Sequence, residues 1–316
     1  MITTNIMGGL GNQLFQIFNA ISYSIDNNIS FVFPDNELLY AGENTTLRHA
    51  YWNSIFYLLK PYLKNEKEIQ YDYKVYENNN SLYRELPSMN YLRNYIAQRL
   101  SYENNITPVI PELNIHLTGY FQSYKYFKHN YDKIIKLLGF KQLKNNILKL
   151  VNDNYIELLE DSISLHFRIG DYVKYIDSHI ILSDQYYIDA MKTIVNKLND
   201  NKVKQYNIIY FCENDDINTV SKRIENIQNI LRENKIDCVF IKSPSILEDW
   251  QEMLFMSMCK HNIIANSSFS WWGAYLNENP EKMVCYSSIY YSQNYDKMVD
   301  DMFPDNWIKI QTSHVE

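Results

Sequence analysis

A chain of 316 residues with a net charge of −7 is longer than one hydrophobic core usually supports and too acidic as a whole to attract nucleic acid or an anionic membrane surface. Its apolar residues, 46% of the total, suffice for two cores, so we expect two domains. No run approaches the ~18 apolar residues of a membrane span, and residues 1–7 lack the charged and apolar segments of a signal peptide. We therefore expect a cytoplasmic protein without a membrane span.

The first elements in chain order read as strand, glycine turn, helix and strand. Residues 2–7 form a short apolar-leaning run, which the glycines from Gly8 to Gly11 interrupt. Apolar residues then recur at helical spacing from Leu14 to Ile25, and a second strand is expected at residues 30–33, before Pro34. This order indicates a parallel β-α-β unit.

The middle of the chain has weaker patterns. Residues 35–105 are rich in Tyr, Asn and Leu, and we expect them to be largely helical. Residues 116–126 read as a strand followed by a turn, and an amphipathic helix is expected from about residue 130. The Asn- and Lys-containing stretch 144–153 is the expected crossover between the two domains.

The second half alternates strands and helices. Strands are expected at residues 163–167, 208–212, 239–242, 262–265 and 283–286. Helical patterns lie between them, at residues 188–198 with Ser183 as N-cap, at 217–231 and at 245–260. This alternation is typical of an α/β fold with a doubly wound parallel sheet, which binds ligands at the carboxyl ends of its strands. We predict an N-terminal domain of residues 1–152 and a C-terminal domain of residues 153–316.

The four cysteines lie far apart and form no Cys-x-x-Cys pair, so zinc and thioredoxin-like sites lack their spacing. Cys212, Cys238 and Cys285 lie in or beside short apolar runs, where a thiol behaves as a small hydrophobic group. We expect these cysteines, and Cys259 with them, to be reduced and buried rather than joined in disulfides.

The first candidate site is the segment GGLGNQ, residues 8–13, which follows the first strand and opens a helix. A glycine turn at a helix N-terminus exposes backbone N–H groups and the positive end of the helix dipole, which suits an anion. The dinucleotide fingerprint G-x-G-x-x-G is not met, because after Gly9 and Gly11 position 14 is Leu. The alternative is a tight turn with Asn12 as a helix cap.

The second candidate is the segment HFRIGDYV, residues 166–173, at the end of a predicted strand. His166 and Arg168 alternate with apolar neighbours, so both are expected on one face. The planar fork of Arg168 suits a diphosphate, and Asp171 is a candidate to orient it, to cap a helix or to accept a proton. The alternative is an Arg–Asp ion pair at a strand end, with a buried histidine.

The third candidate is NSSFSWWGAYL, residues 266–276, also directly after a predicted strand. Its hydroxyl and N–H groups suit phosphate oxygens, and the alternative is a Ser-rich helix cap with core aromatics. The preceding helix places Glu252 ahead of an apolar run. A carboxylate there suits the N–H edge of a purine, although acidic residues are also common at the exposed starts of helices.

In these motifs the chain resembles family 11 glycosyltransferases, the α-1,2-fucosyltransferases. The resemblance covers nearly the whole chain, through GGLGNQLFQ at Gly8, GYFQS at Gly119, HFRIGDYV at His166, FCEND at Phe211 and LFMSMCKHNIIANSSFSWWGAYL from Leu254. It implies a GT-B fold, in which two Rossmann-like domains face each other across a cleft. It also implies an inverting, metal-independent transfer of fucose from GDP-fucose to the hydroxyl of a glycan acceptor, as in galactoside 2-α-L-fucosyltransferases, with no cofactor.

The resemblance also implies roles for single residues. Arg168 would hold the diphosphate and His166 would face the nucleotide, mainly within the C-terminal domain. The rest of the nucleotide site would comprise Asn266, Ser267, Ser268, Phe269 and Ser270. Glu252 stands where related sequences commonly carry Asp, and is the candidate for guanine recognition.

On the other side of the cleft, the resemblance implies a role for the glycine turn. Gly9, Gly11 and Asn12 would face the ligands, and the candidate catalytic residues are Arg168, Asp171 and Asn12. No Asp-x-Asp motif is present, so Arg168 and backbone N–H groups are expected to take the place of a metal ion in stabilising the leaving phosphate. The general base is not identified, and residues 36–115 are expected to shape the acceptor site.

One position departs from the family pattern, which shows two arginines in a row. Ile169 stands at the second position, and a charge-assisted hydrogen bond contributes ~1.5–3 kcal/mol. Its loss is expected to weaken donor binding or to change which donor fits. The alternatives are therefore a different donor, such as UDP-N-acetylglucosamine, or a non-catalytic sugar-nucleotide-binding protein.

Overall fold

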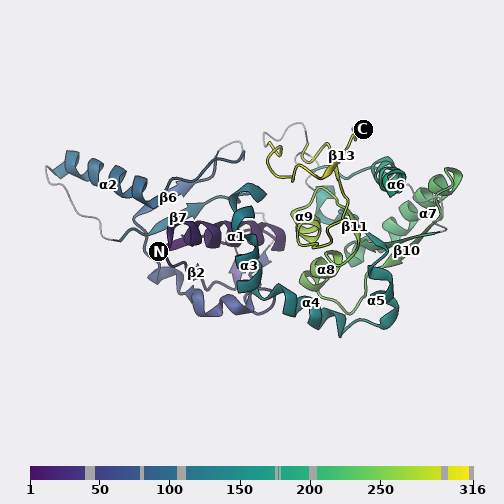
Figure 1. The fold of residues 1–316 in the computed structure, drawn as a ribbon, viewed down its shortest axis with the longest axis horizontal. Coiled ribbons are helices and arrows are strands. Elements are labelled where there is room, and N and C mark those ends of the chain that lie inside the picture. The colour runs from purple at the N-terminus through teal and green to yellow at the C-terminus, as the bar shows by residue number, and fades with distance from the viewer. Residues whose placement is uncertain are drawn as a thin grey trace. The chain divides into compact units, whose positions relative to one another are not determined.

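The computed structural model describes residues 1–39, 47–78, 82–104, 112–174, 177, 179–198, 205–292 and 298–312 (Figure 1). Contacts divide the chain into two units. The first comprises Met1–Phe140 with Met298–Phe303, and the second comprises Lys141–Lys297 with Pro304–Glu316. The change of unit thus lies at Lys141, upstream of the boundary that we predicted at residue 152.

The first unit is built on a three-stranded parallel sheet with the strand order β1-β7-β6. The strands are β1 (Ile2–Thr4), β7 (Ile115–Thr118) and β6 (Tyr73–Tyr76). Helix α1 (Leu10–Asn27) packs against β1, and α3 (Tyr131–Leu138) packs against α1. The predicted strand, glycine turn and helix at the start of the chain are confirmed.

Most other elements of the first unit are short. The short elements are β2 (Phe33–Pro34), β3 (Leu38–Leu39), β4 (Arg48–His49), β5 (Leu63–Lys64) and the 3-10 helices η1 (Tyr57–Tyr62), η2 (Glu66–Glu68), η3 (Tyr124–Tyr126) and η4 (Lys128–Asn130). The longer element is α2 (Met89–Asn104). The prediction that residues 35–105 are largely helical is therefore wrong. Pro61 and Pro87 lack the backbone N–H group that the interior of an α-helix requires. Pro61 lies in the 3-10 helix η1, and α2 is the only α-helix in the described part of this stretch.

The second unit is built on a six-stranded parallel sheet with the order β10-β9-β8-β11-β12-β13. The strands are β8 (Ser162–His166), β9 (Tyr206–Phe211), β10 (Cys238–Lys242), β11 (His261–Ile263), β12 (Val284–Ser287) and β13 (Ile308–Ile310). The helices are α4 (Phe140–Leu148), α5 (Asp153–Leu159), α6 (Asp184–Leu198), α7 (Ile217–Glu233), α8 (Asp249–Met256) and α9 (Ser268–Tyr275), with 3-10 helices η5 (Gly170–Lys174) and η6 (Asn214–Asp216). Each unit thus pairs a parallel sheet with helices, which confirms the α/β class predicted with the GT-B fold.

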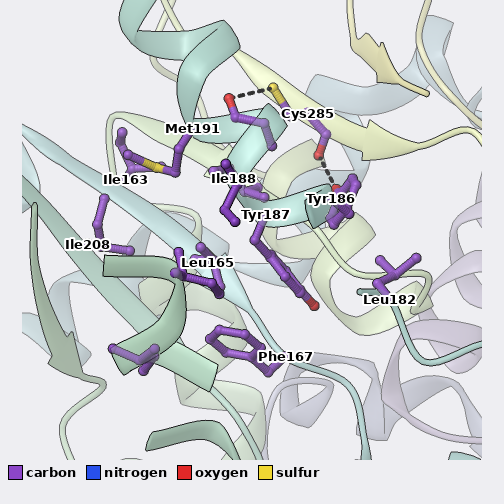
Figure 2. Close-up of a cluster of buried hydrophobic side chains, with 14 of the residues drawn as sticks. Ile163, Leu165, Phe167, Leu182, Tyr186, Tyr187, Ile188, Met191, Ile208 and Cys285 are labelled. Carbon is purple, nitrogen blue, oxygen red and sulfur yellow. Dashed lines mark hydrogen bonds between the residues drawn. The ribbon is translucent and has the colours of Figure 1, made fainter. Parts of the chain in front are cut away.

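The core of the second unit fixes the carboxyl ends of its central strands. Side chains on one face of β8 and the residue after it, including Ile163, Leu165 and Phe167, pack against α6 (Figure 2). The Tyr186 hydroxyl of α6 donates to the carbonyl oxygens of Ile264 at 2.5 Å and Cys285 at 3.2 Å. Tyr186 thus links α6 to the residue after β11 and to the interior of β12.

The four cysteines are free and buried, as predicted. Burial raises the pKa of each thiol, to about 11 for Cys212 and to about 12 for the other three. These thiols therefore stay protonated at neutral pH. In the described part of the chain, no helix combines the length and the apolar character needed to cross a membrane.

Candidate active site

The order of strands in the second unit reverses direction between β8 and β11. From β8 the chain proceeds outward to β9 and β10, then returns to β11 on the other side of β8 and proceeds to β12 and β13. Open α/β sheets bind nucleotides at the carboxyl ends of the strands that flank such a reversal. Two of the predicted segments lie there: residues 166–173 follow β8, and residues 266–276 follow β11.

Arg168 is held between two carboxylates. Its guanidinium donates one hydrogen bond to Asp171 and another to Glu213, which follows β9. The guanidinium carbon also lies 4.9 Å from the centre of the Tyr172 ring. Burial alone would lower the pKa of Arg168. The negative charges of Glu213 and Asp171 outweigh burial, so the pKa of Arg168 lies above its ordinary value. Arg168 is therefore a fixed cation at the end of β8.

The turn that carries Arg168 requires glycine at position 170. Gly170 has a φ of +36°, which a residue with a Cβ atom adopts only with strain. A Cβ atom there would also lie 2.6 Å from an oxygen of the Glu213 carboxylate. The Gly170 N–H donates to Asp216 at 2.8 Å. This backbone geometry lets Arg168 and Asp171 approach each other and Glu213.

His166 is the last residue of β8 and is only 6% exposed. Its ring centre lies 5.4 Å from that of Phe269 in α9. Burial, followed by the charges of Arg168 and Lys242, lowers the pKa of His166 to about 3, so the ring is neutral at physiological pH. Its Nδ1 atom is buried and makes no hydrogen bond to the described residues. A buried polar atom of this kind requires a partner, such as a water or a ligand.

The segment after β11 divides into residues that hold the turn and residues that remain accessible. Asn266 donates to the carbonyl oxygens of Ile180 at 2.6 Å and Tyr290 at 3.0 Å. Ser270 is fully buried, and its hydroxyl donates to the backbone. Ser267 caps α9 by accepting from the Phe269 N–H at 3.3 Å. Ser268 and Phe269 are partly exposed, so their side chains remain accessible to a ligand.

Glu252 lies in the first turn of α8 and is already paired. It accepts from the Ser243 hydroxyl, and the Lys242 ammonium lies 3.6 Å away. Both side chains are largely shielded, with 20% of Glu252 and 24% of Lys242 exposed. Lys242 also donates to the carbonyl oxygen of Cys212 at 3.2 Å, beyond the end of β9. Glu252 thus faces the ends of β9 and β10 and makes no described contact with Arg168.

Sequence reasoning missed Glu213 and Lys242. Glu213 directly follows the predicted strand 208–212, and Lys242 is the last residue of the predicted strand 239–242. The rule that ligands bind at strand ends would therefore have selected both. Glu213 also lies in the FCEND motif. What the sequence does not reveal is that β9 is the neighbour of β8, which brings Glu213 to Arg168.

In the first unit, the glycine turn is packed against its own helix. Gly8 has a φ of +75°, and a Cβ atom there would lie 2.6 Å from the Asn12 amide nitrogen. Gly9 is the N-cap of α1, so the alternative of Asn12 as the cap is wrong. The Asn12 amide oxygen instead accepts from Gln122 at 2.8 Å. The GGLGNQ and GYFQS motifs therefore meet at the carboxyl ends of β1 and β7.

The sequence model of glycosyl transferase family 11 matches residues 1–311. An α-1,2-colitosyltransferase of Escherichia coli is 25% identical in an alignment of 317 residues that covers 98% of this chain and 99% of the relative. The O-antigen biosynthesis glycosyltransferase WbnK of Escherichia coli is 29% identical in an alignment of 325 residues that covers 96% of this chain and 99% of the relative.

Two solved fucosyltransferase structures were also matched. A mutant of Arabidopsis thaliana FUT1 in complex with GDP gives a TM-score of 0.44 at 11% identity, over 90% of this chain and 70% of its own. The fucosyltransferase NodZ from Bradyrhizobium gives a TM-score of 0.40 at 9% identity, over 87% of this chain and 91% of its own.

Proposed function

Because this chain belongs to glycosyltransferase family 11, we propose that it transfers fucose from GDP-fucose to a glycan hydroxyl in α-1,2 linkage, with inversion and without a metal ion. One observation carries the proposal. Arg168 and the N-terminus of α9 follow the two strands, β8 and β11, between which the strand order reverses. A cation and the N-terminus of a helix at such a point suit the diphosphate of a nucleotide sugar.

Arg168 would stabilise the leaving group. Cleavage of the sugar–phosphate bond leaves negative charge on the diphosphate, and donors fixed in advance around that charge lower the barrier. The guanidinium offers two parallel N–H groups to the oxygens of a phosphate. Asp171 and Glu213 accept hydrogen bonds from these groups, so the donor would replace one of the two carboxylates.

The ion pair with Arg168 also bears on the catalytic role of Asp171. The Asp171 carboxylate already accepts a hydrogen bond from Arg168, which fixes it beside the guanidinium. We therefore propose that Asp171 orients Arg168 and is not the general base. Asn12, held by Gln122, is proposed to bind on the acceptor side, with Gly9 and Gly11 shaping the turn.

Two residues suit the base of the donor. A carboxylate can accept from the two N–H groups that guanine presents side by side. Glu252 of α8 supplies such a carboxylate, next to Ser243 at the end of β10. His166 is neutral and has a buried Nδ1 atom without a partner among the described residues. We propose that His166 contributes a hydrogen bond to the nucleotide, and that Phe269 packs beside it.

A second candidate is transfer of a different deoxysugar. One relative is named as an α-1,2-colitosyltransferase, and colitose is fucose without its 3-hydroxyl group. Ile169 supports this candidate, because it stands at the family's second arginine position and is 7% exposed in the core cluster. The polar contact that an arginine there would supply to the donor is therefore missing.

Calorimetric titration of the purified protein tests the donor. GDP, UDP, GDP-fucose, GDP-colitose and UDP-N-acetylglucosamine are each titrated with and without EDTA. The proposal predicts binding of GDP and GDP-fucose that EDTA does not change. Preference for GDP-colitose would favour the second candidate, and preference for a uridine nucleotide would contradict both.

A further inference from the structure

A groove of about 750 Å³ lies in the first unit, between β6 and the start of α2. This volume is in the range of about 300–1,000 Å³ that is usual for small-molecule sites. Its lining is unusually rich in tyrosine, with Tyr73 and Tyr76 from β6, Tyr91 and Tyr95 from α2, and Tyr126. None of the motifs described above accounts for this groove.

Three of the five tyrosines of the groove are exposed, whereas Tyr126 is buried. Tyr76 is 63% exposed, Tyr91 is 61% exposed and Tyr95 is 42% exposed. Figure 1 shows α2 extending away from the rest of the first unit. Among its described side chains, only Met89 and Leu92 are buried, both near its start. Exposed aromatic rings that gather in one place indicate a binding surface.

Three of the rings form a cluster. Tyr91 and Tyr95 lie one helical turn apart, and their planes are inclined by only 12° at a centroid distance of 6.4 Å. The Tyr73 ring meets Tyr95 at an angle of 72° and a distance of 6.1 Å, which extends the cluster onto β6. A pyranose ring has an apolar face of C–H groups and a rim of hydroxyl groups. The exposed faces of these tyrosines suit the apolar face of such a ring.

The rim of the groove supplies hydrogen-bonding groups of both kinds. Lys74 and Arg84 are donors, Glu85 is an acceptor, and each tyrosine hydroxyl is both. Charges of opposite sign in one groove suit a neutral polyol better than a polyanion. The chemistry of the lining therefore matches an uncharged carbohydrate.

Hydrogen bonds within the first unit fix the walls of the groove. The Met89 N–H at the start of α2 donates to Asn27 at 3.0 Å, and the Tyr23 hydroxyl donates to the carbonyl oxygen of Pro87 at 2.5 Å. The Tyr126 hydroxyl accepts from the Arg84 N–H at 3.3 Å. A site formed before binding loses less conformational entropy when a ligand enters.

The groove runs along β6 from its first residue, Tyr73, to its last, Tyr76, and so reaches the carboxyl edge of the sheet in the first unit. β6 and β1 run parallel on either side of β7, so Tyr76 and the glycine turn after β1 lie at the same edge. We propose that the tyrosine groove binds sugar units of the acceptor glycan beyond the one that receives the transferred sugar. This proposal rests on the proposed function for the transfer itself and adds the site that selects longer glycan acceptors.

Kinetics with two acceptors test the groove. Lactose and the tetrasaccharide lacto-N-neotetraose are compared as acceptors for GDP-fucose with wild type, Tyr76→Ala, Tyr91→Ala and the control Tyr102→Ala. Tyr102 lies on α2, is 85% exposed and does not line the groove. Loss of one aromatic face is expected to raise KM for the tetrasaccharide about tenfold, with a smaller change in kcat and in KM for lactose. Tyr102→Ala is expected to match wild type.

Direct binding separates failure of this proposal from failure of the proposed function. Saturation-transfer NMR with lacto-N-neotetraose needs no turnover, and GDP calorimetry and thermal unfolding check the donor site and the fold. Tetrasaccharide signals that weaken in Tyr76→Ala and Tyr91→Ala support the groove even where GDP-fucose is not the donor. Unchanged signals and KM values in both variants overturn it, as does absence of tetrasaccharide binding to wild type. Tyrosine-dependent binding to vesicles of phosphatidylethanolamine and phosphatidylglycerol would also overturn it, in favour of a membrane surface.

Discussion

The guanidinium of Arg168 donates to the carboxylate of Glu213, which follows the neighbouring strand of the same sheet. Glu213 therefore stands where a donor phosphate would bind to the same cation. The Glu213 side chain is 50% exposed, whereas that of Arg168 is 18% exposed. The carboxylate is thus the partner that a phosphate can displace into solvent.

Replacing Glu213 tests this competition. Glu213→Gln is expected to tighten GDP binding about two- to fivefold, because an exposed ion pair contributes at most about 1 kcal/mol. The control is Asp215→Asn, an exposed acidic residue in the same 3-10 helix as Asn214 and Asp216. Calorimetry measures both. Weaker GDP binding by Glu213→Gln would show instead that Glu213 holds Arg168 in its binding position.

Gly170→Ala is expected to destabilise the protein by about 1–3 kcal/mol, because φ at this position is strained for a residue with a Cβ atom. The added methyl group would also meet the Glu213 carboxylate. Gly9→Ala is the control, since a Cβ atom there has no neighbour within 4 Å. Urea unfolding compares the two variants. Equal losses in both would contradict the strain at position 170.

Arg168→Lys is expected to retain the charge but lose most of the activity. A lysine ammonium cannot offer the parallel N–H groups that a guanidinium presents to a phosphate. We expect kcat/KM for GDP-fucose to fall at least about tenfold, which corresponds to one charge-assisted hydrogen bond. Recovery of wild-type kcat/KM by Arg168→Lys would mean that charge alone suffices.

His166 is expected to make the stability of the protein depend on pH below the ordinary pKa of histidine. Its pKa is about 3 in the folded protein and about 6.5 when unfolded, so between these values the unfolded chain binds one more proton. Stability therefore falls as pH drops from 6.5 towards 3, and the loss from His166 at pH 5 is about 2 kcal/mol. Urea unfolding at pH 7 and pH 5 should show a smaller loss for His166→Gln than for wild type. An equal loss would contradict burial of a neutral ring.

Much of the second unit could be predicted from the sequence, because its strands are apolar runs separated by regular helical patterns. β8 to β12 were all expected near their observed positions. β13 was missed, since Ile308 and Ile310 are the only apolar residues in its sequence and do not form an apolar run. Ser183 was predicted as an N-cap, but its buried hydroxyl makes no hydrogen bond among the described residues. Local sequence suggests a cap, whereas packing decides which way the hydroxyl points.

The site was predicted only in part. The motifs select Arg168 and the turn after β11, but strand neighbours arise from the folded sheet, and these bring Glu213 to Arg168. The polar side chains of Asn266 and Ser270 donate hydrogen bonds to backbone carbonyl oxygens. Their expected role in lining the nucleotide site stays a prediction. The tyrosine groove lies where the sequence has no motif, because it combines β6 with a helix whose sequence pattern is weak.

Release of GDP from GDP-fucose in the presence of lactose, compared between wild type, Arg168→Ala and Arg232→Ala, tests the central claim most directly. Arg232 is exposed near the end of α7 and serves as the matched control. We expect kcat to fall at least about a hundredfold in Arg168→Ala, with a cooperative unfolding transition retained, and to stay at the wild-type value in Arg232→Ala. A folded Arg168→Ala variant that releases GDP at the wild-type rate would contradict the proposed role of Arg168 in the transfer.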